Sequence, residues 1–236
     1  MISQKVIIAT DYRGLLRQGK RSWTGMSIKE LVQEMKELGY DVQVVKYSDL
    51  LKYDLNRISN KIILYTSSQN PTYNKYISDI LFFLSEKNIL VPRYEMFLCH
   101  ENKVYQQYIS NKYGIDTLRT YQFCTCTELI NIKGQLSFPL VLKTADGFAS
   151  KGVFLVHSFE EILSHLKPKY FSLPTRKTVT RISKLLLSKN YTLLKELFKE
   201  EVISSRYVLQ EFIPNLKCDW KILILGNRFF GFRRTI

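Results

Sequence analysis

Two alternating hydrophobic periods in the first hundred residues limit most strongly how this chain can fold. Short apolar runs are typical of buried strands, and apolar residues spaced three to four apart are typical of amphipathic helices. The expected strands are 5–9, 41–45, 61–65 and 89–91, and the expected helices begin at Ser27 and Tyr73. Such strand–helix–strand alternation predicts an α/β fold with a small parallel sheet covered by helices.

The first expected helix has a defined beginning and end. Ser27 and Glu30 have the spacing of a capping box, in which the serine oxygen accepts an amide at the helix start and the glutamate reaches back. Gly39 ends the helix, because glycine readily adopts the left-handed conformation common at this position. The face expected to be buried carries Ile28, Leu31, Met35 and Leu38.

The loop after the first expected strand lacks the glycine fingerprint of a dinucleotide site. Its glycines, at positions 14, 19 and 25, do not fit the pattern G-x-G-x-x-G. The loop from Asp11 to Met26 is nevertheless long and basic, and the carboxyl end of a parallel strand is a favoured ligand position. Two interpretations stay open: a loop that holds an acidic substrate, and a flexible surface loop.

The charge balance indicates a surface that attracts anions. The 236 residues include 35 Lys and Arg against 21 Asp and Glu, a net charge of +14. The stretch from His165 to Tyr207 alone holds seven lysines and three arginines against three glutamates. Nucleotides, acidic metabolites, nucleic acid and anionic lipid all suit such a surface. No nucleic-acid recognition motif is present, so a nucleic-acid-binding protein is the less favoured alternative.

The cysteines do not have the spacing of a metal site, and no metal ligands are predicted. Cys124 and Cys126 lack the two-residue spacing and the second ligand pair of a zinc site, so all four cysteines are expected to be core residues or spare thiols. The sequence shows no secretory signal and no apolar run of membrane-spanning length. We therefore expect a cytoplasmic protein without a membrane partner.

Three segments in the second half of the chain carry the chemistry. An apolar strand, 138–143, ends in Lys143, so the strand buries the lysine stem and presents the ammonium above the sheet. The following loop contains small residues that let backbone amides approach phosphate oxygens. The third segment combines the strand 208–213, the run 218–226 and two arginines. Taken singly, each segment also has a purely structural interpretation.

The order of these segments resembles the ATP-grasp superfamily, most closely its glutathione-synthetase-like and ribosomal-protein-glutamate-ligase-like carboxylate–amine ligases. The family pattern is a lysine-ended strand, a small-residue hairpin loop, a strand ending in Q-E-F/Y-I, an acidic residue that leads a strand, and a G-x hairpin. The corresponding pieces here are Lys143, 145–153, 210–213, Asp219 and Gly226-Asn227. By motif the resemblance spans roughly residues 95–236.

The resemblance implies an ATP-grasp fold with three parts. Residues 1–95 would form a small parallel-sheet, Rossmann-like pre-ATP-grasp domain. Residues 96–205 would form the N-terminal ATP-grasp subdomain, with a basic helical insertion at about 165–205. Residues 206–236 would begin the C-terminal subdomain, which would be incomplete, so that the chain is either a fragment or a natural truncation.

The resemblance also implies which residues bind the nucleotide. Two lysines would contact the ATP phosphates: Lys103 and Lys143. A flexible flap would cover them: Gly147, Ser150, Lys151 and Gly152. The strand that reads the adenine edge through its backbone would consist of Gln210, Glu211, Phe212 and Ile213. Asp219 would lie near the ribose or the substrate, and a catalytic basic residue near the transferred phosphoryl group would be Arg233 or Arg234.

The implied reaction is ATP-dependent ligation of a carboxylate to an amine or a related nucleophile. The carboxylate would attack the γ-phosphate to give an acyl phosphate and ADP, and the amine would then displace phosphate. The implied partners are ATP, Mg²⁺ and an acidic small-molecule or peptide carboxylate, and a homodimer is one assembly that the sequence allows. The family's magnesium ligands would be expected beyond residue 236. The alternative is an ATP-binding or interaction module without turnover.

Overall fold

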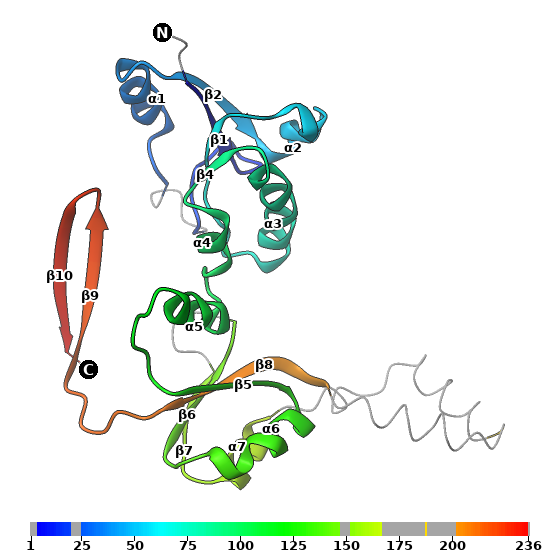
Figure 1. The fold of residues 1–236 in the computed structure, drawn as a ribbon, viewed down its shortest axis with the longest axis vertical. Coiled ribbons are helices and arrows are strands. Elements are labelled where there is room, and N and C mark those ends of the chain that lie inside the picture. Colours follow the sequence, from blue (N-terminus) through cyan, green and yellow to red (C-terminus); the bar gives the residue numbers. More distant parts are fainter. Residues whose placement is uncertain (1–3, 20–24, 147–151, 167–186, 188–201, 236) are drawn as a thin grey trace. The chain divides into compact units, whose positions relative to one another are not determined.

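The computed structural model describes residues 4–19, 25–146, 152–166, 187 and 202–235 (Figure 1). The chain divides into two compact units between Tyr105 and Gln106. The expected basic insertion at about 165–205 lies almost wholly outside the described residues. Within the described part of the chain, no helix is both long and apolar enough to cross a membrane.

The first unit is built on a parallel four-stranded sheet in the order β2-β1-β3-β4. Its strands are β1 (Lys5–Thr10), β2 (Asp41–Lys46), β3 (Ile62–Leu64) and β4 (Ile89–Val91). The connecting elements are α1 (Ile28–Glu37), α2 (Tyr47–Leu50), η2 (Leu55–Arg57), α3 (Pro71–Ser85) and α4 (Tyr94–Leu98). The predicted small parallel sheet is therefore confirmed.

Helix α3 supplies the main core of this unit. Ile77, Leu81 and Leu84 are almost completely buried and belong to one apolar cluster with Ile63 of β3. Burying each such side chain contributes about 1.5–3 kcal/mol. The first helix differs: Ser27 accepts a hydrogen bond from the Glu30 amide as expected, but no residue of α1 is fully buried. Leu38, expected on the buried face, is 76% exposed.

Asn88 ties the end of α3 to the beginning of β3. Its Nδ2 donates to the carbonyls of Leu84 (2.9 Å) and Ile58 (2.8 Å). Its Oδ1 accepts a hydrogen bond from the amide of Lys61 at 3.1 Å. A single side chain thus satisfies one of the carbonyls that a helix C-terminus leaves without a partner, and it also fixes the helix against the strand.

The second unit contains an antiparallel four-stranded sheet in the order β5-β8-β6-β7. Its strands are β5 (Thr120–Thr125), β6 (Leu140–Thr144), β7 (Val153–Val156) and β8 (Val202–Glu211). The helical elements are α5 (Lys103–Lys112), inside which the division of the units falls, α6 (Cys126–Ile132), η3 (Lys133–Gln135) and α7 (Phe159–His165). Strand β8, the last in sequence, lies between β5 and β6.

The two faces of this sheet differ in character. Helices α6 and α7 cover one face (Figure 1), where Leu142 and Leu209 are paired directly and fully buried. Side chains alternate between the two faces along a strand. Lys143 and Gln210 therefore project from the face opposite to this apolar core.

Strands β9 (Cys218–Leu225) and β10 (Arg228–Thr235) form a separate antiparallel hairpin. Gly226 has a positive φ of 59° at the first position of the two-residue turn, where glycine is strongly preferred. Directly paired residues share a face, so Leu223 and Phe230 lie on one face and Ile224 and Phe229 on the other. All four of these apolar side chains are exposed.

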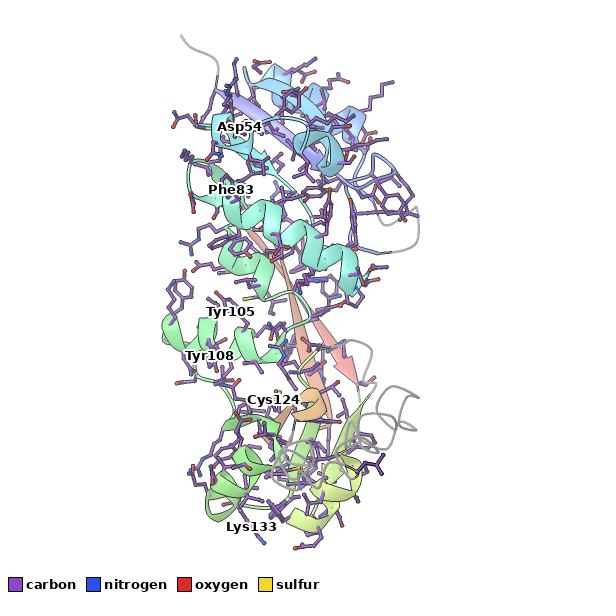
Figure 2. The ribbon with its side chains drawn as sticks, turned by 90° about the vertical axis from the view of Figure 1, so that its right-hand side faces the viewer. Asp54, Phe83, Tyr105, Tyr108, Cys124 and Lys133 are labelled. Atoms are coloured by element: carbon purple, nitrogen blue, oxygen red, sulfur yellow. The ribbon has the colours of Figure 1, made fainter. Side chains whose placement is uncertain are left out.

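Replacing Asn88 with alanine should destabilise the first unit. Asn88→Ala leaves two carbonyls and one amide without their side-chain partner, so we expect a loss of about 1–3 kcal/mol in the free energy of unfolding. Urea-induced unfolding measures this loss. The control is Asn56→Ala, whose exposed side chain donates a hydrogen bond to exposed Asp54 (Figure 2) and should change stability by less than about 0.5 kcal/mol. Equal losses in both variants would contradict the role given to Asn88.

Candidate functional site

Strands β6 and β8 bring two of the predicted nucleotide-binding residues into contact. Lys143 Nζ donates a hydrogen bond to Gln210 Oε1 at 2.6 Å, across 67 positions of sequence. The antiparallel register pairs Lys143 with Val208 and Val141 with Gln210, so the two polar residues are diagonal neighbours on one face. Both side chains are partly buried. The lysine ammonium lies over the face of the sheet opposite to the one that α6 and α7 cover.

Thr120 of β5 extends this row of polar side chains. Gln210 Nε2 donates to Thr120 Oγ1 at 3.4 Å, and the register places the two residues directly opposite each other. The glutamine amide therefore accepts from the lysine on one side and donates to the threonine on the other, which fixes its orientation. Thr120 was not predicted, because 90 residues separate it from Gln210 and no local pattern places β5 beside β8.

The ends of the predicted flap are described, although Gly147, Ser150 and Lys151 lie outside the described residues. Gly152 has a φ of +71°, and a Cβ on it would lie 3.2 Å from Thr144 Cγ2. The Thr144 amide donates to the Gly152 carbonyl at 3.2 Å, and Thr144 Oγ1 donates to the Asp146 carbonyl at 2.8 Å. This position requires glycine both for its backbone conformation and for the close approach of Thr144.

The other end of the flap is attached to β8. Arg206 forms an ion pair with Asp146, with Nη2 at 2.5 Å from Oδ1 and Nε at 3.4 Å from Oδ2. The Ala145 amide donates to the Arg206 carbonyl at 2.8 Å. The two charged side chains are 47% and 63% exposed, so the pair contributes at most about 1 kcal/mol and acts mainly by position. No local sequence pattern indicates this pair, whose members are 60 residues apart.

The predicted adenine-binding segment begins where β8 ends. The Glu211 amide donates to the Arg119 carbonyl at 3.0 Å, so this amide is already used within the fold. Phe212 and Ile213 follow the strand, and no backbone hydrogen bond between described residues engages either of them. Their backbone groups are therefore the ones that this segment can offer to the edge of a base.

The hairpin separates the predicted arginines. Arg234 and Asp219 are directly opposite each other and form an ion pair, with Nε at 2.7 Å from Oδ1 and a second contact between Nη2 and Oδ2. The hydrogen bond from Arg234 holds the pKa of Asp219 below its usual value and raises the pKa of Arg234. Arg233 lies opposite Trp220 on the other face of the hairpin.

Lys103, the other predicted phosphate ligand, is the first residue of α5 and belongs to the first unit. Asn102 precedes it and caps this helix, because its Oδ1 accepts a hydrogen bond from the Tyr105 amide at 3.1 Å. The described residues contain no group of three or more His, Cys, Asp or Glu side chains suited to a metal ion. None of the four cysteines forms a disulfide.

A known ligase resembles this chain in sequence. No family model matches it. The α-aminoadipate–LysW ligase LysX of Saccharolobus solfataricus is 25% identical over 203 residues, which are 84% of this chain and 62% of that ligase. The chain thus spans about three fifths of the length of this relative.

Solved structures with a similar arrangement are those of ligases and synthetases. N5-carboxyaminoimidazole ribonucleotide synthetase PurK in complex with ADP has a TM-score of 0.46 at 16% identity, over 98% of this chain and 52% of that one. A RimK-domain ATP-grasp protein of Sphaerobacter thermophilus has a TM-score of 0.42 at 11% identity, over 93% and 68% of the two chains. The D-alanine–D-alanine ligase of Bacillus anthracis has a TM-score of 0.41 at 15% identity, over 99% and 72%.

The resemblance to known ligases rests on the order of the motifs and on sequence similarity. Lys143, the small-residue loop and the strand ending in Gln210–Ile213 follow one another in the order typical of the family, and β6 and β8 place the first and last of these side by side. The sequence similarity to LysX extends over most of the chain. The chain thus resembles the ATP-grasp superfamily in the order of its motifs and the ligase LysX in sequence.

Proposed function

We propose that this chain binds ATP over the polar face of the β5-β8-β6-β7 sheet and serves an ATP-dependent carboxylate–amine ligase. The observation that carries this proposal is the 2.6 Å hydrogen bond between Lys143 and Gln210, which joins two parts of the family motif that are 67 residues apart in the sequence. The relative LysX is named as a ligase of α-aminoadipate and LysW, which supports a ligase of an acidic substrate here.

Lys143 is the proposed phosphate ligand. Phosphoryl transfer depends on positioning and on neutralisation of charge more than on covalent help from the protein. A lysine held by Gln210 on the sheet face opposite α6 and α7 supplies such a fixed positive charge. We assign Lys103 the same function, and the flap residues Gly147, Ser150, Lys151 and Gly152 the shielding of the phosphates.

The strand end from Gln210 to Ile213 is the proposed adenine site. Gln210 is fixed by its two side-chain hydrogen bonds, and Glu211 by the bond from its amide to Arg119. Phe212 and Ile213 come next and supply the backbone groups for the base. The nucleotide would then extend from this strand end toward Lys143 on the neighbouring strand.

The proposed reaction has two steps. An oxygen of the substrate carboxylate forms a bond with the γ-phosphorus, the bond from that phosphorus to the β–γ bridging oxygen breaks, and ADP leaves. The amine nitrogen then forms a bond with the acyl carbon, phosphate leaves with the former carboxylate oxygen, and the nitrogen loses a proton. A flap that excludes water protects the acyl phosphate between these steps.

The hairpin residues have different proposed tasks. Arg234 is engaged by Asp219, so this pair suits an ordered position near the ribose or the substrate. Arg233, on the opposite face, is the better candidate for the transferred phosphoryl group. We assign no magnesium ligand among the described residues, which contain no group of three or more His, Cys, Asp or Glu side chains suited to a metal ion.

The domain division is also a proposal. We assign 1–95 to a pre-ATP-grasp domain, 96–205 to the N-terminal ATP-grasp subdomain and 206–236 to the beginning of the C-terminal subdomain. In support, the parallel sheet ends with β4 at Val91, and the hairpin forms a sheet separate from that of β5 to β8.

Removing the lysine ammonium should weaken ATP binding. A charge-assisted hydrogen bond contributes about 1.5–3 kcal/mol, so Lys143→Ala should raise the Kd for ATP by roughly 10- to 100-fold. Calorimetric titration with ATP, with and without Mg²⁺, measures this change. The control Lys29→Ala removes the same charge from the exposed surface of α1 and should bind ATP as the unmodified chain does. If the folded chain does not bind ATP, or if both variants bind equally, Lys143 is not at a nucleotide site.

A side chain at position 152 should disturb the base of the flap. Because Gly152 has a positive φ and Thr144 lies close to it, Gly152→Ala should cost about 1–2 kcal/mol of stability and weaken ATP binding. Urea-induced unfolding and calorimetry report the two effects. Gly134→Ala is the matched control, because a Cβ there meets no atom within 4 Å and φ is not positive. A Gly152→Ala chain with unchanged stability and ATP affinity would contradict this role.

A further inference from the structure

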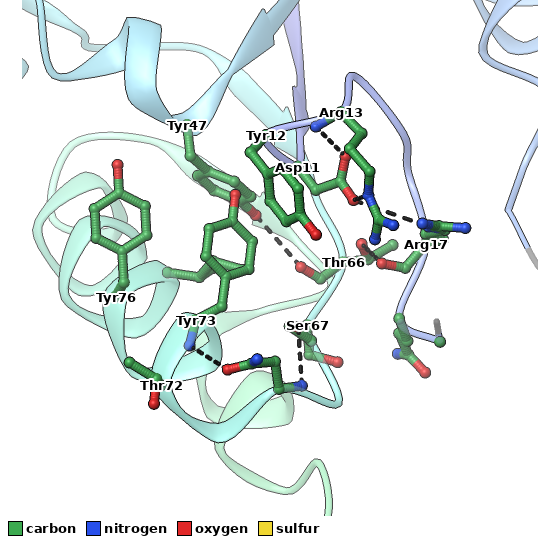
Figure 3. A pocket seen from close by; sticks show the side chains of 15 residues that line it. Asp11, Tyr12, Arg13, Arg17, Tyr47, Thr66, Ser67, Thr72, Tyr73 and Tyr76 are labelled. Atoms are coloured by element: carbon green, nitrogen blue, oxygen red, sulfur yellow. Dashed lines mark hydrogen bonds and ion pairs between the residues drawn. The ribbon is translucent and has the colours of Figure 1, made fainter. Parts of the chain in front are cut away.

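The first unit contains a cavity of about 560 Å³ at the carboxyl ends of β1 and β3 (Figure 3). Asp11 directly follows β1, and Thr66 and Ser67 come shortly after β3. The described residues that line the cavity all come from the first unit. Its volume is that of an ordinary small-molecule site, and this end of a parallel sheet is where ligands bind in open α/β folds.

Arg17 is the unusual residue of this cavity. Its side chain is only 2% exposed. No hydrogen-bond acceptor among the described residues reaches its Nε or its Nη1. The nearest carboxylate oxygen, Asp11 Oδ2, is 3.9 Å from Nε, which is beyond hydrogen-bond distance. A buried guanidinium with unused donors is unfavourable unless an anion completes its hydrogen bonds.

Ser67 adds a second unused group from another loop. Its hydroxyl is buried and has no hydrogen-bond partner among the described residues. A hydroxyl can donate to an anion, so Arg17 and Ser67 offer donors from two separate segments. Two buried polar groups in one cavity without partners among the described residues indicate a site that a ligand completes.

The charge in the cavity favours a singly charged anion. Two arginines and one aspartate are the charged residues among those described in its lining, which leaves one net positive charge. The aspartate is largely occupied: its Oδ1 accepts hydrogen bonds from the amides of Arg13 and Leu15, both at 2.9 Å. Its Oδ2 lies 3.5 Å from Arg13 Nε. Asp11 thus shapes the loop and leaves the donors of Arg17 unused.

The loop that carries Arg17 is held in place before any ligand arrives. Thr66 Oγ1 donates to the Arg17 carbonyl at 3.2 Å, and the Gln69 amide donates to the Gln18 carbonyl at 3.1 Å. Gly14, with a φ of +77°, closes a turn in which its amide donates to the Asp11 carbonyl at 2.9 Å. A site that is already ordered loses less conformational entropy when it binds.

Tyrosine rings form another wall of the cavity (Figure 3). Tyr12 and Tyr73 meet edge to face with centroids 5.5 Å apart, and Tyr73 and Tyr76 stack at 5.6 Å. Burial, and then the charge of Asp11, raise the pKa of Tyr73 to about 12, so this phenol stays neutral and does not repel an anion. The wall suits the carbon part of an organic ligand.

We propose that this cavity binds a small organic carboxylate, with the carboxylate on Arg17 and Ser67 and the carbon part against the tyrosine wall. A guanidinium matches the planar geometry of a carboxylate, and the one net positive charge of the described lining residues matches a single negative charge. A phosphate dianion fits less well, because the loop also lacks the glycine pattern that cradles phosphates. The inference concerns binding by the first unit and does not depend on the proposed ATP site.

The test uses acetate, which contains the carboxylate and little else. Tyrosine ring signals in the NMR spectrum of the full chain should shift saturably with acetate when chloride keeps the ionic strength constant, and acetamide should cause no such shift.

Arg17→Met should weaken acetate binding at least about tenfold. Arg57→Met removes an exposed arginine outside the cavity and should leave acetate binding unchanged. Lys143→Ala should also bind acetate normally, which separates this site from the ATP site.

Ser67→Ala keeps the proposal testable if Arg17→Met fails to fold. It removes a hydroxyl without a partner, so the unfolding temperature should not fall, while acetate binding should weaken several-fold. If Ser67 had only a structural role, Ser67→Ala would lower the unfolding temperature and leave acetate binding unchanged. The proposal is overturned if acetate causes no saturable shift, if acetamide binds equally, or if Arg57→Met weakens binding as much as Arg17→Met does. Tighter binding of inorganic phosphate than of acetate would overturn the carboxylate assignment.

Discussion

The insertion of β8 between β5 and β6 is the interaction on which the second unit depends. It pairs Leu209 with Leu142 on one face, which completes the apolar core beneath α6 and α7. On the other face the same pairing places Gln210 beside Lys143 and Thr120. One register therefore specifies both the core and the polar row, and a slip of one residue would exchange the two faces.

The sequence predicts the individual strands well because each strand depends on neighbouring residues in the chain. The four parallel strands follow from short apolar runs, and Lys143 is conspicuous because a lysine ends such a run. Thr120 and the Asp146–Arg206 pair were missed because their partners are 90 and 60 residues away. The basic loop was noted, but burial of Arg17 depends on tertiary packing that no periodicity reveals.

The two candidate anion sites use cations of different chemistry. Lys143 is a compact charge on a flexible stem, and it stands on a face suited to a mobile, multiply charged phosphate chain. Arg17 is planar and buried, and its loop is fixed by backbone hydrogen bonds, which suits one small anion in one orientation. Under the two proposals, the chain uses lysine to neutralise the large charge of a phosphate chain and arginine to recognise a small planar anion.

The position of β8 as the last strand of its sheet also sets an order of events on the ribosome. Lys143 leaves the ribosome 67 residues ahead of Gln210, and Thr120 leaves it 90 residues ahead. At typical rates of synthesis the lysine then waits for roughly 3 to 13 seconds before its partner strand exists. During that interval β6 has an unpaired edge, and contacts between residues so distant in sequence form slowly. The polar row over the sheet is therefore among the last features of the unit to form, after the parallel sheet of the first unit has been synthesised in full.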